Sequence, residues 1–276
     1  MELPDLSPLH LAVEGGVARL TLDHGKANEM GRDAVAAFER LAAWLETGAV
    51  RVLLTTSTKT TSKGTPIFIS GANVTERRDW DEEQVKAHVR WQRATLARLR
   101  RAPVFHVVVV DGLALGWGTE FLLTADVRIA GPSARMGLPE TGLGILPGAG
   151  GASELAAMVG LPHALRLGMT GEQIGADEAV RIGLVDERHA TRDEALARAE
   201  ALARMVLRRS PSAVAAYKAA AIASIGQPEA VRRDIEARAY EHCVATGDAA
   251  VGRANFEAIV SGQGDVPWGG FRPWQP

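Results

Sequence analysis

The sequence predicts an α/β fold followed by a mostly helical C-terminal part. Short runs of apolar and β-branched residues alternate with segments of helical periodicity in the first half of the chain. After about residue 150, helical segments dominate. The run VFHVVVV at Val104–Val110 is almost continuously apolar, which is typical of a strand buried on both faces of a sheet. These patterns together indicate layers of strands and helices around a core.

The expected strands are short and end at polar loops. Val17–Leu22 alternates between apolar and polar residues and is expected as a strand. The segment after it contains Gly25, Asn28 and Gly31 and is expected as a loop. Further strands are expected at residues 50–55, 66–70, 104–110 and 127–129.

The expected helices have apolar residues at helical spacing. Asp33 is expected to cap a helix from Ala34 to about Glu46, whose buried face carries Val35, Phe38, Leu41, Ala42 and Leu45. A second helix at residues 82–100 has Val85, Val89, Leu96 and Leu99 spaced for burial. Further helices are expected at residues 120–125, 152–158, 195–209, 213–223 and 229–246, with Thr191 and Glu194 at capping-box spacing ahead of the third of these. The Gly-, Pro- and Trp-rich tail at residues 262–276 is expected to be extended, with its tryptophans packed on another surface.

Composition and charge argue against several functional classes. Apolar residues make up 46% of the 276 residues, and the formal net charge of −2 gives no electrostatic argument for binding nucleic acid or an anionic membrane. Cys243 is the only cysteine in the sequence, so neither an intramolecular disulfide nor a cysteine-based metal cluster is expected. The acidic N-terminus lacks a signal-peptide pattern, and the apolar runs are too short to span a bilayer. The expected location is therefore the cytoplasm.

The stretch from Gly112 to Gly151 is the most informative for chemistry. It contains two glutamates, Glu120 and Glu140, each close to turn-forming glycine or proline residues. A pair of carboxylates in an apolar pocket can transfer protons when burial raises a pKa. The residues alone leave two simpler interpretations open. Glu120 could be an acid favoured by a helix N-terminus, and Glu140 could be a solvated loop acid.

Glycines after two expected strands point to a second kind of chemistry. Gly71 follows one strand, and Gly116 and Gly118 flank Trp117 after another. Backbone N–H groups exposed at such turns can stabilise a developing oxyanion. The alternative is that these glycines only allow tight turns. The sequence has no P-loop, H-x-x-x-H or G-x-S-x-G pattern, and His106 within an apolar strand is expected to be a core histidine.

Taken together, these segments resemble the enoyl-CoA hydratase/isomerase (crotonase) family. The resemblance runs from Val17 to about Phe256. It is carried by FISGAN at 68–73, DGLALGWGTE at 111–120, ADVRIA at 125–130, MGLPETGLGILPGAGG at 136–151 and GEQIGADEAVRIGLVDE at 171–187.

The family resemblance implies an α/β fold in which repeated ββα units wind into a crotonase-like spiral, capped by C-terminal helices that build trimers or hexamers. We accordingly expect a catalytic core at residues 1–200, and a C-terminal helical oligomerisation region with an extended tail at residues 201–276. The implied partners are an acyl-CoA thioester substrate and further copies of the chain, as a homotrimer or a dimer of trimers. No cofactor is implied besides the coenzyme A that belongs to the substrate.

Specific residues receive roles from the same resemblance. Ala72 and Trp117 match the two backbone N–H donors of an oxyanion hole. Glu120 and Glu140 match the glutamates that, in true hydratases, orient and deprotonate water while a proton reaches Cα. Contacts with the substrate and its CoA part are implied for Lys26, Ala27, Gly71, Asn73, Val74, Thr75, Gly116 and Gly148.

Three positions depart from the family pattern. Trp117 stands where glycine is usual, Asn73 where aspartate is common, and GASEL at 151–155 where GTQRL is common. The side chain of Trp117 must enter either the core or the acyl pocket. The two glutamates favour hydration of a 2-enoyl-CoA, or the reverse dehydration. The departures leave open another crotonase-type reaction (double-bond isomerisation, decarboxylation or C–C hydrolysis) or a non-catalytic acyl-CoA-binding subunit.

Overall fold

Two mostly parallel sheets form the centre of the molecule. The computed structural model describes residues 3–262 and 264–276. The larger sheet has the order β1–β2–β3–β5–β7–β10, and only its β1–β2 pair is antiparallel among the described strands. The smaller sheet has the order β4–β6–β8–β9, with β8–β9 antiparallel. The strands are β1 His10–Glu14, β2 Val17–Leu22, β3 Val52–Ser57, β4 Ile67–Ile69, β5 Phe105–Val110, β6 Leu113–Leu115, β7 Val127–Ala130, β8 Arg135–Gly137, β9 Ile174–Gly175 and β10 Glu187–Arg188.

Successive strands alternate between the two sheets. β3 is followed by β4, β5 by β6, and β7 by β8, and a helical segment follows each pair. Equivalent strands of successive units then pair in parallel, so the chain winds as a spiral. The predicted crotonase-like α/β spiral of repeated ββα units is confirmed.

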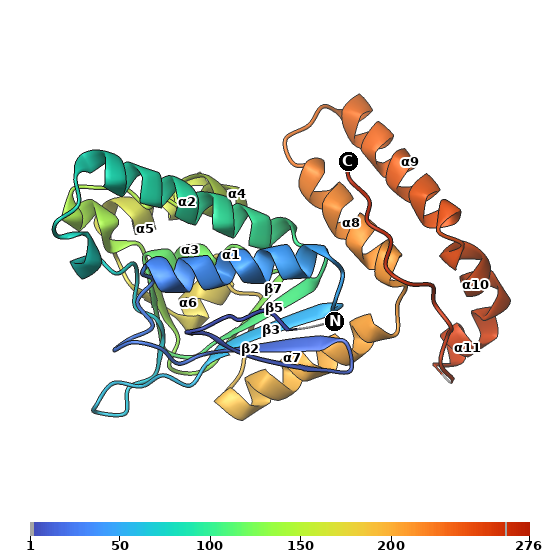
Figure 1. Ribbon diagram of the computed structural model, residues 1–276, viewed down its shortest axis with the longest axis horizontal. Helices are drawn as coiled ribbons and strands as arrows, with labels where there is room; N and C mark the ends of the chain where they lie inside the picture. Colours follow the sequence, from blue (N-terminus) through green and yellow to red (C-terminus); the bar gives the residue numbers. More distant parts are fainter. Residues whose placement is uncertain (1–2, 263) are drawn as a thin grey trace.

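Helices cover both faces of the larger sheet (Figure 1). One face packs on α7, where buried alanines meet β-strand valines such as Val107 and Val109. Val108 and Val110 point to the other side, into the main core beneath α1, α2 and α3. The prediction that this strand is buried on both faces is therefore confirmed. The helices are α1 Arg32–Glu46, η1 Thr75–Arg77, α2 Glu82–Arg101, α3 Trp117–Leu122, η2 Pro139–Leu143, α4 Ser153–Val159, α5 Leu161–Thr170, α6 Ala176–Arg181, α7 Arg192–Leu207, α8 Pro211–Ala223, α9 Glu229–Ala245, α10 Asp248–Ala254 and α11 Phe256–Ser261.

The ends of two helices test the capping predictions. Thr191 and Glu194 form the predicted capping box ahead of α7, with each side chain accepting from the other residue's backbone N–H. The prediction for α1 was wrong. Gly31, in extended conformation, is the N-cap, and Asp33 lies inside the first turn with no capping hydrogen bond. The predicted apolar face of α1 is nevertheless fully buried.

The inner face of α2 differs from the sequence prediction. Leu96 and Leu99 are buried as expected, but Val85 and Val89 are only half-buried. The buried positions nearer the N-terminus of α2 are polar: His88, Gln92 and Thr95. Tertiary partners explain this reversal in part, because Gln92 Oε1 accepts a hydrogen bond from Arg77 of η1 at 3.3 Å.

The C-terminal arm, residues 211–276, stands beside the sheet-containing body, with α8 and α9 packed on one another (Figure 1). The described part of the tail is extended, as predicted; Gln263 lies outside the described residues. Trp268 Nε1 donates to the carbonyl of Arg208 at 3.0 Å, which anchors the tail to the end of α7. The predicted boundary at residue 200 stays a prediction, and α7 runs across it. Within the described ranges, no helix is both long and apolar enough to cross a membrane.

Candidate active site

The turn between β6 and α3 brings the two predicted glutamates together. Gly116 has φ +53°, which favours glycine, and a Cβ at that position would lie 2.5 Å from Glu140 Oε1. Gly118 is just as tight, because a Cβ there would lie 2.3 Å from the carbonyl oxygen of Ile69 in β4. The two glycines around Trp117 are therefore required by close approach, beyond the needs of a simple turn. The carboxyl group of Glu140 rests directly against the start of the helix that carries Glu120.

Glu120 is held by backbone groups from a distant loop. Its Oε1 accepts hydrogen bonds from the N–H groups of Ala149 (2.7 Å) and Gly151 (2.8 Å). Only 3% of the residue is exposed. Burial raises the pKa of Glu120, while the two N–H groups act in the opposite direction by stabilising the carboxylate. The orientation of this carboxyl group is thus fixed by two donors.

Glu140 has a different environment. It lies in η2, and its Oε2 is buried without a hydrogen-bond partner among the residues that the structure describes. Burial raises the pKa of Glu140 to about 7, and the charge of Glu120 adds to the rise. Near neutral pH this carboxyl group can therefore exist in both protonated and ionised forms. The interpretation of Glu140 as a solvated loop acid is wrong.

Two backbone N–H groups lie at neighbouring strand ends beside these acids. β4 and β6 pair in parallel; Gly71 and Ala72 follow β4, and Gly116 and Trp117 follow β6. The residues on either side of Ala72 pair with Met30: its N–H donates to the Gly71 carbonyl, and its carbonyl accepts from the N–H of Asn73. The N–H of Ala72 itself has no backbone acceptor in the described chain. Trp117 is the first residue of α3, where an N–H has no acceptor within the helix. This arrangement provides two available donors on adjacent turns.

The side chain of Trp117 enters the core. It is 2% exposed, and its ring stacks on Phe121 with centroids 5.7 Å apart and packs against Phe38 at the same distance. Of the two possibilities that the sequence left open, the structure therefore selects the core. The bulky side chain is compatible with an available backbone N–H at the same residue.

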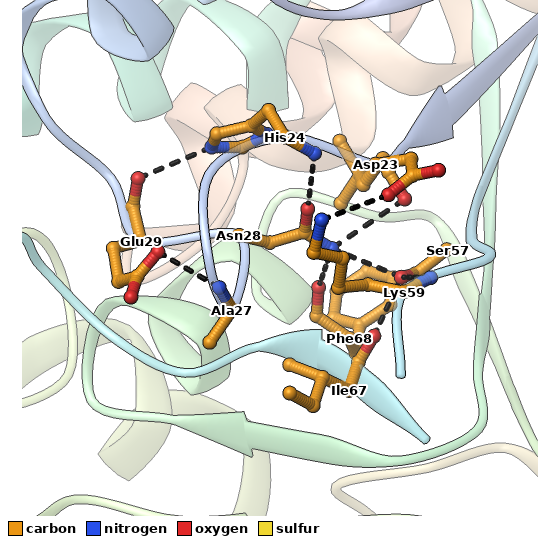
Figure 2. Close-up of polar contacts among 10 residues, drawn as sticks. Asp23, His24, Ala27, Asn28, Glu29, Ser57, Lys59, Ile67 and Phe68 are labelled. Carbon is orange, nitrogen blue, oxygen red and sulfur yellow. Dashed lines mark hydrogen bonds and ion pairs between the residues drawn. The ribbon is translucent and has the colours of Figure 1, made fainter. Parts of the chain in front are cut away.

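The loop with Lys26 and Ala27 is fixed beside these turns by a buried asparagine. Asn28 has φ +53°; its Oδ1 accepts from the N–H of His24 at 2.8 Å, and its Nδ2 donates to the carbonyl of Phe68 at 2.8 Å. Figure 2 shows this network, including the bond from Asn28 to Ser57 Oγ. The carbonyl of Ala27 accepts from the N–H of Ser70, next to Gly71. From the sequence, Asn28 was expected in a loop that contacts CoA, and its buried hydrogen bonds were not predicted. Asparagine adopts a positive φ more readily than most residues, which is the signal that the sequence offers.

The other residues with an expected substrate contact surround the same region. Asn73 Oδ1 accepts a hydrogen bond from Thr75 Oγ1 at 2.7 Å. Val74 and Thr75, which follow the Ala72 turn, are exposed. The carbonyl of Gly148 accepts from Arg93 Nε at 2.7 Å, immediately before Ala149, the partner of Glu120. Lys26 is exposed. Within the described ranges, no group of three or more His, Cys, Asp or Glu residues is arranged to hold a metal ion.

Known proteins resemble this chain in sequence and in overall fold. The sequence profile of the family described as "Enoyl-CoA hydratase/isomerase" matches residues 13–259. The chain belongs to this family. An enoyl-CoA hydratase from Bacillus anthracis is 29% identical, superposes with a TM-score of 0.84, and is matched over 93% of this chain and 97% of its own.

Two Pseudomonas aeruginosa proteins are similar as well. DspI is 28% identical with a TM-score of 0.85, over 97% of this chain and 98% of its own. AtuE is 29% identical with a TM-score of 0.84, over 94% and 98%. Members of the enoyl-CoA hydratase/isomerase family act on acyl-CoA thioesters. The chain is therefore a crotonase-superfamily protein.

Proposed function

We propose that this protein is an enoyl-CoA hydratase, which adds water to the double bond of a 2-enoyl-CoA or removes it in reverse. The observation that carries the proposal is the pair of dissimilar carboxyl groups beside two available N–H donors. Glu120 Oε1 accepts two hydrogen bonds, whereas Glu140 Oε2 has no partner in the described chain. A site that adds H and OH across a double bond needs one base and one acid.

In the proposed reaction, each carboxyl group transfers one proton. The thioester oxygen accepts hydrogen bonds from the N–H groups of Ala72 and Trp117, which stabilise negative charge as it develops on that oxygen. Ionised Glu120 takes a proton from water as the hydroxyl adds to Cβ. Protonated Glu140 gives its proton to Cα as the enolate collapses. Proton exchange with solvent then restores both acids, and no cofactor is needed because the addition involves no net oxidation or reduction.

The coenzyme A part of the substrate would lie on the exposed turns nearby. Lys26 and Ala27 are held next to Gly71 by the Asn28 network, and Asn73, Val74 and Thr75 continue from the Ala72 turn. We also assign substrate contacts to the backbone of Gly116, which lies against Glu140, and of Gly148, which precedes Ala149. The exposed cation of Lys26 suits a phosphate of the ligand.

The proposed function is tested by hydration of crotonyl-CoA and of longer, branched and aryl 2-enoyl-CoAs. We expect loss of the enoyl-thioester absorbance and formation of a 3-hydroxyacyl-CoA. Turnover of a 3-enoyl-CoA or a β-keto thioester, with none of any 2-enoyl-CoA, would identify another crotonase-type reaction instead. Correctly folded protein that turns over no thioester would contradict catalysis and favour a binding subunit.

We also propose that the protein acts as a homotrimer or a dimer of trimers in the cytoplasm. Large hydrophobic side chains are exposed along the C-terminal arm, including Tyr217 (79%), Tyr240 (71%) and Phe256 (66%). Tyr217 and Tyr240 line one groove between α8 and α9, and a large exposed apolar patch is typical of an association surface. Light scattering should give a mass near a threefold or sixfold multiple of 29.3 kDa; a monomer at all concentrations would contradict the assembly.

A further inference from the structure

A cavity of about 320 Å³ lies between α2, α3, α4 and the end of α8. Its floor is buried and consists of the Glu120 carboxyl group with Leu96, Leu123 and Thr124, each 3% exposed. This volume is at the lower end of the range of about 300–1,000 Å³ that is typical of small-molecule sites. The cavity thus suits a short group rather than a long fatty chain.

The proposed chemistry directs the acyl group into this cavity, and the inference rests on that proposed function. With the thioester oxygen on the Ala72 and Trp117 N–H groups, Cα and Cβ lie beside Glu140 and Glu120. The part of the acyl group beyond Cβ must then continue past Glu120. Because Glu120 forms part of the cavity floor, the cavity is the space available to that part.

The rim of the cavity carries three arginines on one side, Arg93, Arg100 and Arg101 of α2. Ile222 and Ile225 at the end of α8 line it as well. Arg100 forms an ion pair with Glu154, and Arg93 donates to the Gly148 carbonyl. The guanidinium of Arg101 makes no ion pair or side-chain hydrogen bond with any described residue. Three cations therefore face one acid at the rim.

The electrostatics agree with an excess of positive charge. Burial is the main cause of the lowered pKa of Arg100, and the neighbouring charge of Arg101 lowers this pKa further. Arg93 is near enough for its charge to oppose the rise in the pKa of Glu120. An alkyl tail ending at this rim could contact Ile222 and Ile225 but would leave the charges of the arginines uncompensated. A terminal anion would compensate them, and its charge-assisted hydrogen bonds would be stronger than neutral ones.

We propose that the substrate is a short enoyl-CoA whose acyl group ends in a carboxylate, bound at the mouth of this cavity by Arg101. The apolar floor formed by Leu96 and Leu123 holds the methylene groups between the double bond and the carboxylate. Arg101 is a specificity residue in this account, because it contacts the far end of the substrate and not the reacting atoms.

The test compares two saturated acyl-CoA ligands of equal chain length, one ending in a carboxylate and one in a methyl group. Saturated thioesters bind without reacting, so calorimetry measures the preference independently of turnover. We expect wild-type protein to bind the carboxylate-ended ligand more tightly by at least about threefold, the size expected for an accessible ion pair. The preference should disappear in Arg101→Gln and reverse in Arg101→Glu.

Arg90→Glu is the matched control, because Arg90 is also an exposed arginine of α2 but does not line the cavity. It should keep the wild-type preference. Equal binding of the two ligands by wild-type protein, or an Arg101→Glu variant that keeps the preference, would overturn the inference. Failure of the proposed function would look different: binding would persist, and no 2-enoyl-CoA of either type would be hydrated.

Discussion

Glu120 and Glu140 lie in two regions of the same site that differ in how they treat a carboxyl group. Around Glu120, the loop at 149–151 supplies two backbone donors at 2.7 and 2.8 Å. Around Glu140, the short η2 segment buries an oxygen and offers it no partner in the described chain. Burial raises the pKa of both side chains, but only Glu120 accepts hydrogen bonds from the 149–151 loop, which favour its ionised form.

The comparison shows that hydrogen-bond donors modify the pKa shift that burial causes. Both carboxyl groups are withdrawn from water, which raises the pKa of each. Donors from the Ala149–Gly151 turn stabilise the ionised form of Glu120 alone. Such a division between acid and base is what water addition requires near neutral pH.

Removing the base should have the largest effect. Glu120→Gln keeps an oxygen that can accept from Ala149 and Gly151 but cannot take a proton from water. We expect kcat for 2-enoyl-CoA hydration to fall by about 10³-fold, within the range typical of lost general base catalysis. Thermal unfolding is the control, and the folded variant should melt close to wild type. A fall of less than tenfold would assign the base to another group.

Removing the acid should have a smaller and pH-dependent effect. For Glu140→Gln we expect kcat to fall by about 10²-fold. Wild-type activity should fall as pH rises through about 7, the pKa of Glu140, and this limb should be absent in the variant. If the activity of Glu140→Gln also fell as pH rose through about 7, the group that titrates there would be another residue.

Stability offers an independent check on Glu140. Its raised pKa means that between pH 4.5, the ordinary value, and about 7 the folded state binds more protons than the unfolded state. The contribution of Glu140 to the stability of the wild type therefore decreases as pH rises through that window. Glu140→Gln should lose this dependence and become more stable relative to wild type above pH 7, as measured by denaturant unfolding. An unchanged pH dependence would contradict the assignment.

Displacing Glu140 should have an intermediate effect. In Gly116→Ala, the new Cβ would lie 2.5 Å from Glu140 Oε1, and the backbone has φ +53°. We expect a loss of about 1–2 kcal/mol in unfolding free energy from the backbone alone, and a roughly tenfold lower kcat. Gly144→Ala is the matched control, with φ +76° and open space around its Cβ. It should lose similar stability and keep its activity; equal activity of the two variants would argue against the close approach.

Trp117→Phe should have the smallest effect on activity. The backbone N–H remains, and the smaller ring still packs on Phe38 and Phe121, so a loss of about 1 kcal/mol in stability is expected. kcat/KM should stay within about twofold of wild type for every acyl group tested. A change in acyl-chain preference would mean that the ring lines the acyl pocket and not the core alone.

Local patterns predicted much of this structure. The valine run of β5, the apolar face of α1 and the capping box of α7 depend on neighbouring residues and were confirmed. The N-cap of α1 was predicted wrongly because Gly31, and not Asp33, takes the extended conformation before the helix. On the polar inner face of α2, Gln92 accepts a hydrogen bond from η1, a contact that periodicity within α2 does not reveal.

The candidate site was predictable in its members but not in its geometry. Glu120 and Glu140 could be named from motifs, but the donors to Glu120 come from residues 29 and 31 positions away. Such pairing depends on how the spiral closes, as does the direction of the Trp117 ring. Asn28 contacts β3 and β4 across 29 and 40 positions, so its role also emerges only in the folded chain.

Carboxyl titration by ¹³C NMR of glutamate-labelled protein tests most directly the claim that the two glutamates differ in proton affinity. We predict a carboxyl resonance that titrates near pH 7 in wild type, persists in Glu120→Gln with a lower midpoint, and disappears in Glu140→Gln. The lower midpoint follows because the charge of Glu120 helps to raise the pKa of Glu140. A resonance near pH 7 that survives in Glu140→Gln and disappears in Glu120→Gln would contradict the account, since it would exchange the acid and the base.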